Sequence, residues 1–145
     1  MGKSLSAFAG TMRKLARDLD ELAHLSAMAG AEAVLRDWID VMPVDTSEAI
    51  SNTQIGINRM PIGPIPAYFR GRKGSTRGAS GDRAREEALQ TLKTKKPGQT
   101  IYISNTAGHI TKLDQGSSIQ FAGGFLPRAL IAFHAAVQAA KTRLT

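Results

Sequence analysis

The sequence predicts an α+β fold, in which a short β-sheet packs against an N-terminal helical region and a C-terminal helix. Apolar residues recur every three or four positions near both ends of the chain, which is typical of amphipathic helices. Between them, the segments TQIGIN and TIYIS alternate apolar and polar residues, as half-buried strands do. Two short strands among several helices favour the α+β class.

The length of 145 residues predicts one domain covering residues 1–145. Within it we expect N-terminal helices in 1–42, strands, a basic loop and a middle helix in 43–125, and a C-terminal helix in 126–145. Hydrophobic residues make up 42% of the chain, which is enough for a packed core.

Two apolar stripes mark the N-terminal region. The first consists of Leu5, Phe8, Met12, Leu15, Leu19 and Leu22, and the second of Met28, Ala31, Leu35, Trp38 and Met42. Because the second stripe is out of phase with the first, we expect a kink or break around residues 24–26, with Pro43 ending the second segment. Core packing explains both stripes; the alternative assigns part of the first helix to a neighbouring subunit.

The segment that begins at Pro43 predicts a structural turn, which is made by Pro43, Asp45 and Thr46. Asp45 and Glu48 have the spacing of a capping box that starts a short helical turn. Three prolines within 61–69 exclude regular structure there. Farther along, we expect a helix from Asp82 to about Lys95, with Ala84, Ala88, Leu89 and Leu92 inward, and a short helical turn at residues 110–114.

The C-terminal helix is expected to begin near Pro127, because proline is favoured at the first helical position. Its predicted buried stripe is Leu126, Leu130, Phe133, Val137, Ala140 and Leu144.

The segment 70–85 is the strongest electrostatic feature of a chain whose net charge is +7. It carries six basic residues and one acid among glycines and serines, which predicts a flexible cationic loop. These basic residues are Arg70, Arg72, Lys73, Arg77, Arg83 and Arg85. Such a loop favours an anionic partner, either nucleic acid or an acidic protein surface; the alternative is a mobile loop whose charge only aids solubility.

No arrangement of residues suggests catalysis. The chain has no cysteine, and none of His24, His109 and His134 has metal-ligand spacing from another histidine or a carboxylate cluster. A nucleophile-elbow motif is also missing. We therefore expect no enzymatic activity, no cofactor and no metal, and the lack of a long apolar run argues against a membrane partner.

Three segments together resemble the tail-completion (neck) protein family of long-tailed bacteriophages. They are PVDTS, KPGQTIYISNTAGHITKLDQGSS and GGFLPRAL, and the similarity runs from about Pro43 to the end. The family usually has glycine where Ser47 stands, glutamate where Asp114 precedes Gly116, and often an aromatic residue where Gly108 and His109 stand.

The resemblance implies a small α+β subunit that forms a ring, commonly of six copies, at the head–tail junction of the virion. The ring would surround the DNA path and join other neck, portal-side and tail proteins, after assembly in the host cytoplasm. It implies an interface loop containing Asn105, His109, Asp114, Gly116 and Ser117, while the basic loop would face packaged DNA or a neighbouring ring. The alternative is a small basic protein that binds nucleic acid without sequence preference.

Overall fold

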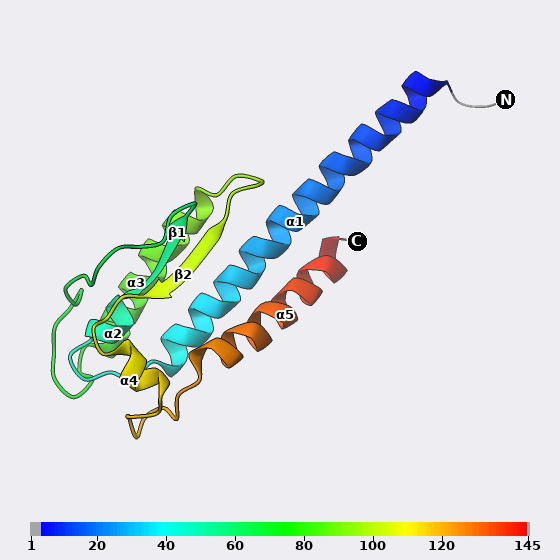
Figure 1. Ribbon diagram of the computed structural model, residues 1–145. Helices are drawn as coiled ribbons and strands as arrows, with labels where there is room; N and C mark the ends of the chain where they lie inside the picture. Colours follow the sequence, from blue (N-terminus) through cyan, green and yellow to red (C-terminus); the bar gives the residue numbers. More distant parts are fainter. Residues whose placement is uncertain (1–3, 145) are drawn as a thin grey trace.

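The computed structural model describes residues 4–144, which form five helices and one two-stranded sheet (Figure 1). The elements are α1 (Leu5–Val41), α2 (Glu48–Ser51), β1 (Thr53–Ile57), α3 (Arg77–Lys93), β2 (Ile101–Asn105), α4 (Ile110–Asp114) and α5 (Phe125–Leu144). β1 and β2 are antiparallel, with Ile55 opposite Ile103. The expected α+β class is confirmed, as are both strands and the helical turn at 110–114.

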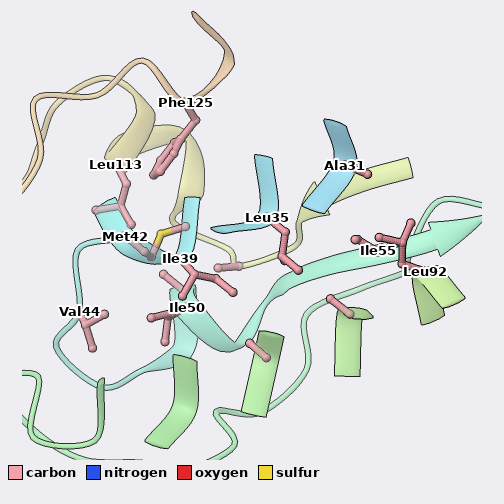
Figure 2. Close-up of a cluster of buried hydrophobic side chains, with 14 residues drawn as sticks. Ala31, Leu35, Ile39, Met42, Val44, Ile50, Ile55, Leu92, Leu113 and Phe125 are labelled. Carbon is pink, nitrogen blue, oxygen red and sulfur yellow. The ribbon is translucent and has the colours of Figure 1, made fainter. Parts of the chain in front are cut away.

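The core lies where the sheet, α3 and the C-terminal half of α1 meet (Figure 2). Leu35, Ile39 and Met42 of α1 are buried against Ile50 and Ile55. On the α3 side, three of the expected inward residues, Ala84, Ala88 and Leu92, are also buried, and the fourth, Leu89, is partly buried. α5 runs beside the C-terminal half of α1 and ends before α1 does, so the N-terminal half of α1 projects beyond the rest of the molecule (Figure 1).

The expected break around residues 24–26 is wrong, because α1 is one continuous helix. At 100° per residue, the two apolar stripes lie roughly 150° apart around this helix. The second stripe faces the sheet and α3. The first lies on the same side of α1 as Gly30 and Asp37, which contact Phe133 and Arg128 of α5. The change of phase therefore reflects two different faces of α1, one toward α5 and the other toward the sheet and α3.

α5 begins at Phe125 rather than near Pro127, and most of its expected buried stripe is wrong. Phe125, Ala129 and Ala140 are the buried residues, and only the last of these was expected. Leu126, Leu130 and Leu144 are exposed instead. Small side chains explain this arrangement: a Cβ at Gly30 would overlap the ring of Phe133, so glycine and alanine let the two helices approach closely.

The segment 70–85 is not a flexible loop throughout, because α3 starts at Arg77, five residues before the expected position. Ser80 is fully buried and fastens the preceding chain: its hydroxyl accepts from the Phe69 N–H at 3.1 Å and donates to the Phe69 carbonyl at 3.0 Å. Gly81 packs against Ile50, where a Cβ would lie 3.0 Å from the Ile50 Cδ1 atom. These tertiary contacts outweigh the low helix propensity of serine and glycine.

The expected capping box at Asp45 and Glu48 does not form. Ser47 precedes α2 with φ of 69° and makes no side-chain cap. The Asp45 carboxylate instead accepts from the Lys73 N–H at 2.7 Å, and the Asp45 carbonyl accepts from the Gly74 N–H at 2.9 Å. Pro43 is buried and Thr46 exposed, so this turn joins the end of α1 to the chain before α3.

The left-handed conformation of Ser47 predicts how two substitutions will differ. Ser47→Gly and Ser47→Ala both lose the 2.8 Å hydrogen bond between Ser47 Oγ and Thr76 Oγ1. Only alanine keeps a Cβ in this strained region, so the glycine variant should be more stable than the alanine variant by about 1 kcal/mol. Urea unfolding of the two variants measures the difference; equal midpoints would contradict it.

Within residues 4–144, no helix has both the length and the apolar character that crossing a membrane requires.

Candidate assembly surfaces

Arg77 is a structural residue rather than part of a free basic surface. Its guanidinium donates to the carbonyl of Met42, to that of Ile39 at 3.2 Å and to that of Asp40 at 2.7 Å. These carbonyls belong to the last turn of α1, where no following N–H satisfies them and the helix dipole favours a positive charge. Arg77 thus caps α1 from the first turn of α3.

Arg83 and Arg85 form ion pairs with neighbouring acidic side chains. Arg83 forms ion pairs with Glu86 and Glu87 one turn along α3. Arg85 lies 3.7 Å from a carboxylate oxygen of Asp40 and 3.6 Å from one of Asp82. All of these pairs are partly exposed and contribute little to stability, but they reduce the positive charge that α3 presents to a partner.

Arg70, Arg72 and Lys73 are the members of the predicted basic loop whose side chains make neither an ion pair nor a hydrogen bond among the described residues. We call these three residues the basic edge. All three are exposed, but Asp45 and Ser75 hydrogen-bond to the backbone at Lys73 and Arg72. The basic edge is therefore a turn held in a defined position.

The aromatic residues beside the basic edge differ in their environments. Tyr68 packs against α3, and its burial raises the pKa of its hydroxyl, with a further contribution from Glu87. Phe69 is about half exposed. Of these two residues, only Phe69 is therefore available to stack on a base, which gives little support to binding of single strands.

Two matched substitutions separate the capping role of Arg77 from the role of charge alone. Arg77→Met should lower the free energy of unfolding by about 1–2 kcal/mol, because three carbonyls at the end of α1 lose their donor. Arg72→Met removes the same charge from an exposed side chain and should change stability by about 0.5 kcal/mol or less. Thermal unfolding followed by circular dichroism compares them, and equal losses would refute the capping role.

The expected interface loop after β2 contains residues that hold the fold together. Asn105 donates to the Ala49 carbonyl at 2.7 Å and accepts from the Ala107 N–H at 3.0 Å. The Asp114 carboxylate accepts from the Phe125 N–H at 2.8 Å, which places a negative charge at the start of α5. Gly116 has φ of 85°, a left-handed conformation that suits glycine in a tight turn.

The rest of this loop is exposed. His109 and Ser117 point to solvent, and Ile119, at the tip of the loop, is fully exposed. Gln120 ties the loop to the turn after α1, since its side chain accepts from the Val44 N–H at 3.1 Å and donates to the Val44 carbonyl at 3.3 Å. His109, Ser117 and Ile119 are thus the side chains that this loop could offer to a partner.

One important feature was not assigned from the sequence, and another was given a main interpretation that the structure does not support. Asn52 is fully buried and joins α2, the loop at Ile65 and Thr106, although nothing in its local pattern indicates such a role. The second feature is the first apolar stripe of α1, which is exposed between Leu5 and Leu19. We call the helix segment Leu5–Leu19 the arm. Its helical periodicity was clear in the sequence, but core packing was the main interpretation of that periodicity.

Among residues 4–144, no three histidine or acidic side chains gather into a possible metal site. Comparison of the chain with protein-family models, with curated proteins and with solved structures gave no match.

Proposed function

We propose that this chain is a structural subunit of the bacteriophage head–tail junction, which assembles as a ring of copies around the DNA path and joins head to tail. The proposal includes contacts with other neck, portal-side and tail proteins, and it involves neither catalysis nor a cofactor. The subunit would be made in the host cytoplasm and reside in the neck or tail terminus of the virion. The observation that carries the proposal is the exposed apolar arm.

The arm presents a patch that is unusual for a protein acting alone. Leu5, Phe8, Met12, Leu15 and Leu19 are between 48% and 87% exposed and lie on one side of the helix. Together they expose roughly 500 Å², near the upper end of the about 300–600 Å² found for the largest patch of a typical monomer. Covering it would contribute on the order of 10 kcal/mol before the costs of association. A partner surface is therefore strongly favoured.

The order of the three motifs supports the neck as the setting. The turn containing Asp45, the strand β2 with its following loop, and the glycines before α5 occur in the order of the family that the chain resembles. The left-handed backbone at Ser47 also suits a position where that family usually has glycine.

Assembly of the purified chain tests the proposal. Size-exclusion chromatography with light scattering, followed by negative-stain imaging, should show ring-shaped particles. A variant carrying Phe8→Glu and Met12→Glu should remain monomeric while keeping its circular dichroism spectrum, because both side chains are exposed in the subunit. A wild-type chain that stays monomeric at micromolar concentration and does not bind virion necks would overturn the proposal.

The second candidate function is sequence-nonspecific binding of nucleic acid, and the basic edge is the observation that favours it. Three free cations would give a salt slope of about −3 for duplex DNA. Steep salt-dependent binding by isolated monomers, lost when Arg70, Arg72 and Lys73 are changed to glutamine, would favour this function. Rings with weak DNA affinity would favour the neck subunit.

A further inference from the structure

Two hollows share α1 as their floor. The first lies between β2 and α5 and the second between α4 and α5, and we call the two together the groove. At one end is a hollow of about 450 Å³ whose lining includes Ala23, Ala27, Ala31, Ile101, Ile103 and Phe133. At the other end is a hollow of about 270 Å³ whose lining includes Trp38, Asn105, Ile110, Thr111 and Leu126. Residues 101, 103 and 105 alternate along β2 and share one face, so one strand face borders both hollows.

We propose that this groove receives the arm of a second copy of the chain. The inference rests on the proposed self-assembly and goes beyond it by naming the surface that each arm occupies. It pairs a projecting apolar helix with an apolar groove, a common mode of helix recognition.

The geometry of α1 explains why the occupant belongs to another copy. The arm and the groove floor are parts of one continuous helix, so the arm points away from its own groove and cannot fold back into it (Figure 1). At 1.5 Å per residue, the arm from Leu5 to Leu19 spans about 21 Å and the floor from Ala23 to Trp38 about 23 Å. The two surfaces therefore match in length.

The arm and the groove also match in the side chains that they present to each other. Alanines form much of the floor beside Phe133, so a helix could approach closely and place leucine side chains in the hollows. Leu126, which lines the second hollow, is 65% exposed and would be covered at the same time. Covering both surfaces removes roughly 1,000 Å² from water, about the minimum for a specific interface.

One end of the groove contains a buried cation. Lys95 is buried there, and its ammonium donates to His24 Nδ1 at 2.9 Å and to the Lys96 carbonyl at 3.2 Å. Lys95 forms no ion pair with an acid within residues 4–144, although Asp20 lines the same hollow. On the arm, Asp18 is already paired with Lys14 at 2.6 Å, so apolar contact rather than charge carries the pairing of arm and groove.

Pairing the arm with a groove joins two different surfaces. Each copy would offer its arm to one neighbour and its groove to another, and such heterologous contacts generate rings when the rotation closes. An arm-to-arm pair would instead leave the groove and the leucines of α5 uncovered.

Cross-linking tests the pairing directly, because the natural chain contains no cysteine. A Thr11→Cys variant marks the arm beside its apolar stripe, while Ala23→Cys and Thr111→Cys mark the two hollows. The matched control is Ile131→Cys, an exposed position on α5 that lies roughly 140° around the helix from Leu126. The arm variant is co-assembled with each of the others, treated with a short bismaleimide and imaged by negative stain.

We expect cross-linked dimers when the Thr11→Cys chain is mixed with Ala23→Cys or Thr111→Cys, and at least tenfold fewer with Ile131→Cys. Rings without arm-to-groove cross-links, or cross-links of the Thr11→Cys chain only with itself, would overturn the inference while leaving self-assembly intact. Arm-to-groove cross-links in closed dimers instead of rings would support the pairing and refute the neck ring. A chain that remains monomeric would overturn both.

Discussion

Replacing Asn52 by alanine should lower the free energy of unfolding by about 3–4 kcal/mol. The Asn52 side chain is fully buried and takes part in four hydrogen bonds. Its amide donates to the carbonyls of Glu48 and Ile65 at 2.8 and 2.9 Å, and its oxygen accepts from the Ile65 N–H and the Thr106 hydroxyl, both at 2.8 Å. Alanine would leave the polar groups of Ile65 without these partners in a site that excludes water.

The effect should be visible in urea unfolding monitored by the fluorescence of Trp38. Gln90→Ala is the control, since it removes an exposed amide from α3 and should change stability by about 0.5 kcal/mol or less. Asn52→Asp keeps the two acceptor contacts but loses both donors and buries a charge, so it should also be strongly destabilising. A loss below about 1 kcal/mol for Asn52→Ala would show that water replaces the side chain.

Local features of the fold were predictable from the sequence. The alternation in TQIGIN and TIYIS identified both strands, because Ile55 and Ile103 face the same core across the sheet. The helical turn at 110–114 was also found, and Ala84, Ala88 and Leu92 were correctly placed inward on α3. In each case the pattern reflects a single buried face within one element.

The partners of the helices were not predictable, for a physical reason. Hydrophobic spacing shows which face of a helix avoids water, but not whether the covering surface belongs to the same chain. On α5 the leucines give the stronger apolar signal, yet the alanine face meets α1 because Gly30 permits close approach. On α1 the periodicity of Leu5 to Leu19 is clear, but the end of α5 meets only the last part of the arm, where Leu144 lines a hollow with Leu15 and Leu19.

The candidate basic site shows a similar limit. Composition identified six cations, but it could not reveal that Arg77 caps α1 or that Arg83 and Arg85 pair with acids. Those roles depend on the contact between α3 and the end of α1. The charge available to a partner is therefore smaller than the sequence suggests, which shifts the balance from nucleic-acid binding toward assembly through apolar surfaces.

Gly123→Ala should be the most damaging substitution in the loop before α5, and Gly124→Ala is its matched control. Both glycines have positive φ, 96° and 85°, so alanine is strained at either position and should cost about 1 kcal/mol. A Cβ at Gly124 would meet no atom within 4 Å. At Gly123 it would overlap the Asp114 carbonyl and lie 2.8 Å from the Gly116 nitrogen, both of which are backbone atoms.

Because backbone cannot rotate aside as a side chain can, Gly123→Ala must separate this loop from α4. The separation would break the hydrogen bonds from Gly124 and Phe125 to Asp114 and displace Phe125, whose ring lies 5.8 Å from that of Trp38. We expect a loss of about 3 kcal/mol or more and a change in Trp38 fluorescence before global unfolding. Hydrogen exchange should show faster exchange at Phe125 in this variant than in Gly124→Ala; equal exchange and stability in the two variants would disprove the backbone clash.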